Sequence, residues 1–242
     1  MDKILFEKLE KLKNSCTIKD NYKCSKCRDL GYILVKTKEG ESAYPCECLS
    51  EKRAMENLAK CGLSDVFKTK TFKNYECTTT VQKTAKYIAL NYCKNNFKNN
   101  ESIIICGRPG SGKTHLAIAV MLNLIKQGIS CKYVEYNSMM IALKQSIMDS
   151  TNHTIEMEKL LSPRVLFVDD FLKGRVNESD VSYIFRLVNS RYLQGKQFII
   201  STEKTMDDIL KWDEAVGSRL VEMAQQNIII FGKETANYRL KK

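Results

Sequence analysis

The sequence predicts an α/β protein in which a three-layer domain with a parallel sheet follows a small cysteine-containing module. Three observations predict this architecture. Over most of the chain, short β-branched runs alternate with helix-periodic segments, which is the order expected of a parallel sheet covered by helices. The glycine-rich segment 107–114 lies between one such run and one such helix. Four cysteines form two close pairs near the N-terminus.

Composition limits the classes of protein and of partner. The chain has 242 residues, 43% of them apolar, and its 39 Lys and Arg against 28 Asp and Glu give a net charge of +11. This charge favours a polyanionic partner such as nucleic acid, or else reflects a lysine-rich, solvated surface. No apolar run approaches the roughly 18 residues of a membrane span, so we expect no membrane association and a location in the bacterial cytoplasm, or the host cytoplasm if a phage encodes the protein.

The first residues predict a short amphipathic helix. From Asp2, a plausible N-cap, Leu5, Leu9 and Leu12 fall on one face. This face either packs on its own module or docks onto a partner protein.

The ten cysteines of an unexported chain are expected to be thiols or metal ligands, because cytosolic reductants keep disulfides open. Cys24-x2-Cys27 and Cys46-x-Cys48 are separated by 18 residues, a spacing that suits tetrahedral zinc, although the second pair is one residue tighter than usual. The alternative is four unrelated buried or free cysteines. If zinc fills all four thiolates, the site is structural and has no open position for catalysis.

A helix over Glu51–Lys60 is expected to end at Gly62. We place the domain boundary there, giving an N-terminal module over residues 1–62 and a nucleotide-binding domain over residues 63–242. Just beyond the boundary, Phe67, Phe72 and Tyr75 occur at loop spacing. They either flank a purine base or anchor the linker on the core.

The pattern G-x-x-x-x-G-K-[ST] between a strand and a helix predicts a phosphate-binding loop, or Walker A motif. Its glycines let backbone N–H groups point inward at a helix N-terminus, where they attract phosphate oxygens of ATP or ADP. Lys113 is expected to reach the β- and γ-phosphates, and the Thr114 hydroxyl to bind Mg²⁺. The predicted nucleotide-binding residues are Gly107, Arg108, Pro109, Gly110, Ser111, Gly112, Lys113, Thr114 and His115.

The segment Val165-Leu166-Phe167-Val168-Asp169-Asp170 delivers two carboxylates at the C-terminal end of an apolar strand, where open α/β sheets bind ligands. It is typical of a Walker B element. Asp169 is expected to hold Mg²⁺ and Asp170 to polarise the attacking water.

The remaining chain continues the alternation. Phe198–Thr202 is a predicted strand with a polar tip followed by Glu203, Thr205–Trp212 a predicted helix, and Ile228–Phe231 a last strand. Between the last two, Arg219 is either a surface arginine or a residue that acts in trans on the γ-phosphate of a neighbouring subunit.

Taken together, GRPGSGKTHLA, VLFVDDF, FIIST, GSRL, IIIFG and NYR resemble, in this order, the AAA+ ATPases of the DnaC and DnaI helicase-loader group. The lead-in GLSDVFKTKTFKNYE adds to the resemblance, which covers roughly residues 63 to 240. A zinc-binding module before the ATPase resembles DnaI-type and phage loaders, in which that region engages the replicative helicase.

The resemblance implies that Arg219 is an arginine finger through which subunits associate, and that Arg239 makes a sensor-2-like contact with nucleotide. It also exposes one departure, because Glu203 stands where the family usually has Asn at sensor 1. We expect Thr202 to substitute in polarising water and hydrolysis to be slow, suiting a nucleotide-gated switch, with turnover below about 10 per second.

Three hypotheses follow. In the first, ATP orders a ring or filament, basic residues such as Lys144, Lys173 and Arg175 hold single-stranded DNA, and the N-terminal module delivers a hexameric replicative helicase. The second is a transposition-type AAA+ regulator that coats duplex DNA and recruits a transposase. The third, motivated by Glu203, is an interaction protein with an inactive nucleotide site.

Overall fold

The computed structural model describes residues 10, 22, 24–37, 40–174, 177–232 and 238–240. The predicted N-terminal face of Leu5, Leu9 and Leu12 lies outside the described residues, as does Arg175. The chain divides into two compact units, one of residues 1–56 with 126–128 and one of residues 57–125 with 129–242. The functional division at residue 62 stays a prediction.

The first unit contains a β-hairpin. Strands β1 (Tyr32–Thr37) and β2 (Gly40–Pro45) pair antiparallel, with Tyr32 opposite Pro45 and Thr37 opposite Gly40. Among the described residues of this unit, the apolar cluster is small: Ala43 is its buried member, and Tyr32 and Leu34 pack partly against it. So small an apolar cluster gives little stability by itself, and modules of this size generally depend on a metal or on disulfides.

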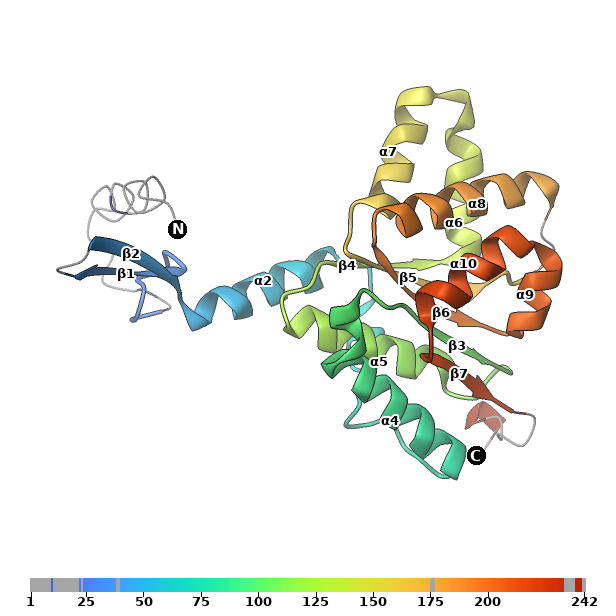
Figure 1. The fold of residues 1–242 in the computed structure, drawn as a ribbon, viewed down its shortest axis with the longest axis horizontal. Coiled ribbons are helices and arrows are strands. Elements are labelled where there is room, and N and C mark those ends of the chain that lie inside the picture. Colours follow the sequence, from blue (N-terminus) through green and yellow to red (C-terminus); the bar gives the residue numbers. More distant parts are fainter. Residues whose placement is uncertain are drawn as a thin grey trace. The chain divides into compact units, whose positions relative to one another are not determined.

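The second unit is built on a five-stranded, wholly parallel sheet with the order β4-β5-β6-β3-β7 (Figure 1). The strand that precedes the phosphate loop, β3, therefore lies between β6 and β7, while the acid-bearing strand β5 lies between β4 and β6. The strand bounds are β3 Ile103–Gly107, β4 Cys131–Glu135, β5 Val165–Phe171, β6 Gln197–Thr202 and β7 Ile228–Phe231.

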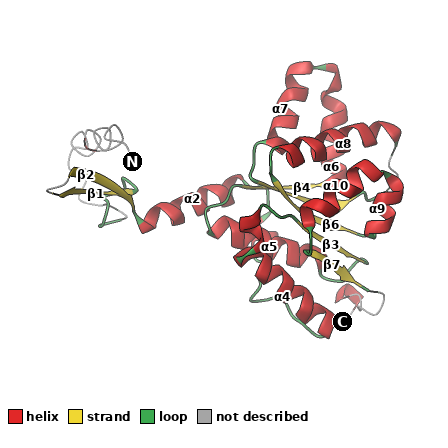
Figure 2. Ribbon diagram, in the orientation of Figure 1, coloured by secondary structure: helices red, strands yellow, loops and turns green. Residues whose placement is uncertain are grey.

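Helices cover both faces of this sheet, which confirms the predicted three-layer α/β architecture (Figure 2). The described α-helices are α2 Glu47–Lys60, α3 Asp65–Lys68, α4 Thr80–Lys94, α5 Lys113–Lys126, α6 Tyr136–Gln145, α7 Ser150–Leu161, α8 Glu178–Leu193, α9 Met206–Trp212 and α10 Glu214–Ala224. Short 3-10 turns are η1 Asn96–Asn99, η2 Ser146–Met148 and η3 Tyr238–Leu240.

The alternation of side chains along each strand separates the two faces. On β3, Ile103 and Ile105 join the core beneath α4 and α5, whereas Ile104 and Cys106 join the core formed with α6 to α10. On β5, Phe167 faces α5 and Val168 faces the opposite layer. This parity decides which polar residues at the strand ends lie beside the phosphate loop.

Several helices begin where the sequence provides a side-chain cap. Thr79 and Gln82 form a capping box at the start of α4, and Thr205 and Asp208 form one at α9. Helix α10, for which the sequence analysis assigned no element, begins at Asp213, whose carboxylate accepts a hydrogen bond from Val216 N.

Gly217 obscures α10 in the sequence, because glycine is a poor helix former. Its role is steric, since a Cβ there would lie 2.8 Å from Leu210 Cδ2 on α9. Arg219 therefore belongs to a helix and not to a loop before the last strand.

Candidate nucleotide site and metal centre

The phosphate loop joins the C-terminal end of β3 to the N-terminus of α5, as its motif requires. Gly110 and Gly112 have φ values of +75° and +96°, in the region that favours glycine. A Cβ on Gly107 would lie 2.6 Å from Phe231 Cβ, and one on Gly112 would lie 3.1 Å from Tyr75 Oη. Neighbouring side chains thus leave no room at either position for a residue larger than glycine.

Lys113 is held inside the loop. Its side chain is buried, and Nζ donates a hydrogen bond to the Arg108 carbonyl oxygen at 3.0 Å. Burial lowers the pKa of Lys113, although the nearby carboxylates of Glu203, Asp170 and Asp169 act in the opposite direction. The ammonium is therefore already directed toward the space that the loop encloses.

Thr114 and Asp169 form the predicted magnesium pair. The Thr114 hydroxyl donates to Asp169 Oδ1 at 3.0 Å, which joins α5 to the end of β5. Hydroxyl and carboxylate oxygens are the ligands that Mg²⁺ prefers, so the donor set fits this ion. Burial raises the pKa of Asp169, and hydrogen bonds from Ser201 and Thr114 partly offset that effect.

Ser201 was not predicted, yet it contacts both aspartates. Its hydroxyl donates to Asp169 Oδ1 and accepts a hydrogen bond from the backbone N of Asp170 at 3.1 Å. Tyr133 Oη adds a longer contact of 3.4 Å to Asp169 Oδ2. Side chains from β4 and β6 thus orient the carboxylate of Asp169 on β5.

Asp170 is directed differently from Asp169. Its φ is +54°, and the β5–β6 register shifts between Val168 and Phe171, as at a β-bulge. Its Oδ2 lies 2.6 Å from Lys173 Nζ, which is also 3.9 Å from Glu203 Oε1. The carboxylates of these two neighbouring residues of β5 therefore have separate partners.

Thr202 is fully buried and bonded within the chain. Its hydroxyl donates to the Phe171 carbonyl oxygen at 2.8 Å and accepts from Lys204 N at 3.1 Å. To polarise water, as the sequence analysis expected, the hydroxyl would have to leave these bonds. Its catalytic role stays a prediction.

The segment before α4 packs against the phosphate loop. His115 Nε2 lies 3.1 Å from Thr71 O and 3.2 Å from Asn74 Oδ1, and its ring meets Tyr75 edge to face at 5.1 Å. Burial lowers the pKa of His115. Phe67 and Phe72 pack against the core beneath α4 and α5. These contacts are the ones expected if the two rings anchor the linker on the core.

The C-terminal turn η3 also reaches the phosphate loop, a contact that sequence reasoning missed. Tyr238 N donates to Gly110 O at 2.9 Å, and Tyr238 Oη donates to Glu76 Oε2 at 2.8 Å. Arg239 follows directly in this turn, so its backbone lies near the loop. Its sensor-2-like role stays a prediction.

Arg219 is fixed on the face of the sheet opposite α5. Its Nε donates to Asn189 Oδ1 at 3.0 Å and its Nη1 to Ala215 O at 2.8 Å. The guanidinium lies 5.2 Å from the centre of the Phe185 ring and 5.7 Å from that of Tyr192. These partners all belong to α8 and α10.

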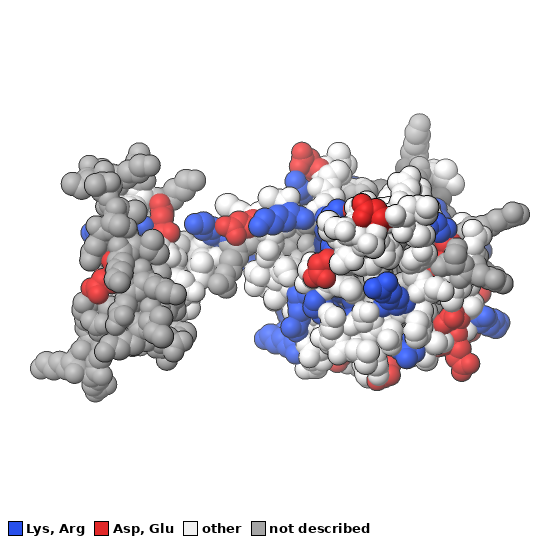
Figure 3. Space-filling model, turned by 90° about the horizontal axis from the view of Figure 1, so that it is seen from above, with Lys and Arg blue, Asp and Glu red and all other residues white. Residues whose placement is uncertain are grey.

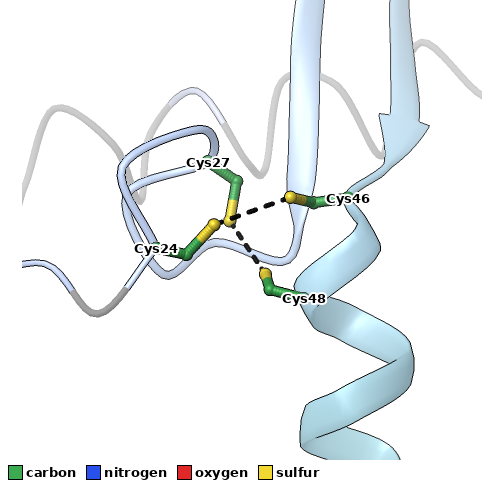
Figure 4. Close-up of side chains that lie close together, drawn as sticks. All are labelled: Cys24, Cys27, Cys46 and Cys48. Carbon is green, nitrogen blue, oxygen red and sulfur yellow. Dashed lines mark hydrogen bonds between the residues drawn. The ribbon is translucent and has the colours of Figure 1, made fainter.

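The four predicted metal ligands converge in the first unit (Figure 4). Cys24 and Cys27 come from the turn before β1, Cys46 follows β2, and Cys48 lies in the first turn of α2. Their sulfur atoms all lie within 4.8 Å of one another, with 3.7 Å between Cys24 and Cys46 and 3.3 Å between Cys27 and Cys48.

Zinc fits this donor set. Zn–S bonds of about 2.3 Å in a tetrahedron place sulfurs roughly 3.8 Å apart, close to the separations observed. Crowding by neighbouring thiols raises the pKa of Cys48, whereas a hydrogen bond from the Cys27 backbone lowers that of Cys24 to about 7. A divalent cation would remove the repulsion among four thiolates.

The surface carries both positive and negative side chains. On the face shown in Figure 3, Lys and Arg side chains are interspersed with Asp and Glu. Of the DNA-contact candidates, Lys144 pairs with Asp180 and Lys173 with Asp170. Within the described part of the chain, no helix is long and apolar enough to cross a bilayer.

Comparison with known proteins places this architecture in a family. The family model described as IstB-like ATP binding protein matches residues 47–234, which include the phosphate loop and both aspartates. The chain belongs to this AAA+ family of ATP-binding proteins.

Relatives of the IstB-like protein come from several settings. It is 34% identical over 221 residues to YqaM of Bacillus subtilis, covering 85% of this chain and 70% of YqaM. It is 24% identical over 194 residues to the replicative helicase loader DnaC of Escherichia coli K12, covering 78% of each. It is 28% identical over 149 residues to a protein of insertion sequence IS21 from Pseudomonas aeruginosa, covering 60% of this chain and 54% of that protein.

The fold agrees with a solved relative. The crystal structure of the DnaC helicase loader superposes with a TM-score of 0.63 at 23% identity, covering 70% of this chain and all of that one. This likeness confirms the predicted α/β fold of the second unit.

Proposed function

We propose that this IstB-like protein is an ATP-dependent loader of a hexameric replicative helicase, placing it on single-stranded DNA during replication initiation. The observation that carries the ATP-dependent part is the junction of α5, β5 and β6, where Thr114, Asp169 and Ser201 join the phosphate loop to the acidic strand. The relation to the loader DnaC supports the helicase as partner.

The residues divide the work of slow ATP hydrolysis among them. The loop's N–H groups and Lys113 hold the phosphates, and Thr114 and Asp169 hold Mg²⁺, which neutralises charge on the phosphates when bound. Asp170 polarises the attacking water. Within its own chain, Arg219 is bonded to α8 and α10 on the face of the sheet opposite α5, away from the phosphate loop. It therefore acts on the γ-phosphate bound by a neighbouring copy.

The cysteine module has a separate role in this proposal. Residues 1–62, stabilised by zinc at Cys24, Cys27, Cys46 and Cys48, dock onto the helicase. Basic side chains of the assembled subunits hold single-stranded DNA by its phosphates, so DNA affinity is expected to fall steeply with added salt.

The test is co-purification with the replicative helicase of the same cell, with and without ATP. The intact chain is compared with a chain that starts at Leu63 and with Lys113→Ala. A complex that requires residues 1–62 and changes with ATP supports the loader. Nucleotide binding that Lys113→Ala leaves unchanged would instead indicate an inactive nucleotide site.

The IS21 relative favours a second candidate, a transposition-type regulator that coats duplex DNA and recruits a transposase. The two candidates share the ATPase unit and differ in DNA substrate. Filaments on duplex DNA, together with no helicase complex, would support the regulator.

A further inference from the structure

Three charged side chains meet at the ends of β5 and β6, beside the phosphate loop. Lys173 Nζ is 2.6 Å from Asp170 Oδ2 and 3.9 Å from Glu203 Oε1. The turn that carries Lys173 is fixed by its backbone, because Lys173 N donates to Asp170 O at 3.1 Å and Leu172 is buried. The ammonium is thus placed between two carboxylates from neighbouring strands.

This group shares its surroundings with the phosphate-loop lysine. Burial lowers the pKa of the Lys113 ammonium; the carboxylates of Glu203, Asp170 and Asp169 raise it, and Lys173 lowers it. Lys173 also acts on the carboxylate of Glu135 at the end of β4. The contacts of Lys173 thus place the carboxylate of Glu203 in one charged cluster with that of Asp170.

The charges explain how a glutamate is tolerated at this position. Two lysines, Lys113 and Lys173, and three acids, Asp169, Asp170 and Glu203, are gathered at this end of the sheet. These five groups carry one net negative charge, and without Lys173 they would carry two. Like charges at short range repel even where solvent reaches them. A γ-phosphate brings further negative charge to the same space, whereas ADP does not.

We propose that Lys173 determines the preference of this site for nucleoside triphosphate over diphosphate, by neutralising Asp170 and Glu203 where they face the γ-phosphate. The inference rests on the proposed ATP-dependent function and adds a specificity residue to it. In this proposal the Lys173 ammonium is the counter-ion that offsets the negative charge of Glu203.

The experiment measures the affinity of the full chain for Mg²⁺–ADP and for a non-hydrolysable Mg²⁺–ATP analogue by titration calorimetry. Lys173→Met is expected to weaken binding of the analogue about tenfold and of ADP no more than about twofold, given a half-exposed charge. Adding Glu203→Gln to Lys173→Met is expected to restore most of the lost affinity, and Lys173→Arg to retain it.

Lys159→Met is the matched control. Lys159 makes the same kind of i,i+3 pair, at 2.6 Å from Glu156, and its side chain is 53% exposed against 48% for Lys173. It should leave both affinities unchanged. Equal losses for the two nucleotides, no loss, or no recovery with Glu203→Gln would overturn the inference while leaving ATP binding intact. A wild-type chain that binds neither nucleotide would instead overturn the proposed function.

Discussion

Replacing Ser201 by Ala should lower the stability of the second unit by more than the loss of an ordinary buried hydroxyl group does. Ser201 is fully buried, and its hydroxyl bonds the Asp169 carboxylate and the Asp170 backbone N–H. A hydrogen bond to a charged acceptor contributes about 1.5–3 kcal/mol, and the N–H left without its partner costs about 1 kcal/mol more. We therefore expect Ser201→Ala to lower the free energy of unfolding by about 2.5–4 kcal/mol.

Ser146→Ala supplies the comparison. Ser146 is equally buried, but its hydroxyl donates to the uncharged Leu143 carbonyl oxygen and lies 3.0 Å from His153 Nδ1, so about 1 kcal/mol is expected. Both variants are measured by urea unfolding at neutral pH without nucleotide or Mg²⁺. A cost for Ser201→Ala no larger than that for Ser146→Ala would refute the argument that the buried carboxylate makes Ser201 special.

Three further predictions concern other parts of the molecule. Zinc analysis should give about one metal ion per chain. Cys24→Ser or a strong chelator should remove the ion and unfold residues 24–48, which hydrogen exchange would detect. A module that is folded without metal would contradict this prediction. Gly112→Ala should weaken ATP binding at least tenfold, because φ is +96° and the new Cβ meets Tyr75, and binding unchanged in calorimetry would show that the loop adapts. Glu135→Gln should lower the free energy of unfolding by about 1 kcal/mol at pH 7, because the Glu135 carboxylate caps α6. The pKa of Glu135 is lowered in the folded state, so the difference in stability between variant and wild type should disappear as the pH falls below about 4. A difference in unfolding free energy that does not change with pH would count against the cap.

The parts of the site that the sequence reveals are those whose chemistry lies within one short segment. The phosphate loop is one contiguous segment, and Asp169 and Asp170 are adjacent in sequence. The strands before both motifs and the helix after the loop can be recognised from their periodicity. The cysteines are equally local, since two close pairs carry the whole donor set.

The parts that the sequence does not reveal depend on parity and on distant contacts. Phe198–Thr202 is a continuous buried run without alternation, so nothing in it shows which of Ser201 and Thr202 faces α5. The structure decides this, because Ile199 lies on the α5 face and Ser201 shares its parity. The contact of Tyr238 with Gly110 joins segments far apart in the chain, and no local pattern predicts it.

The same parity separates the two halves of the proposed ATPase reaction. Thr114, Asp169 and Ser201 bond to one another on the α5 side of the sheet, whereas Arg219 is bonded and stacked on α8 and α10, which pack on the other side. An arginine fixed by two hydrogen bonds and two rings loses little rotational freedom when it meets a phosphate, so the entropic cost of completing the site falls. A second copy of this chain that presents its α8–α10 face to the phosphate loop would therefore supply an Arg219 whose side chain is already held in place.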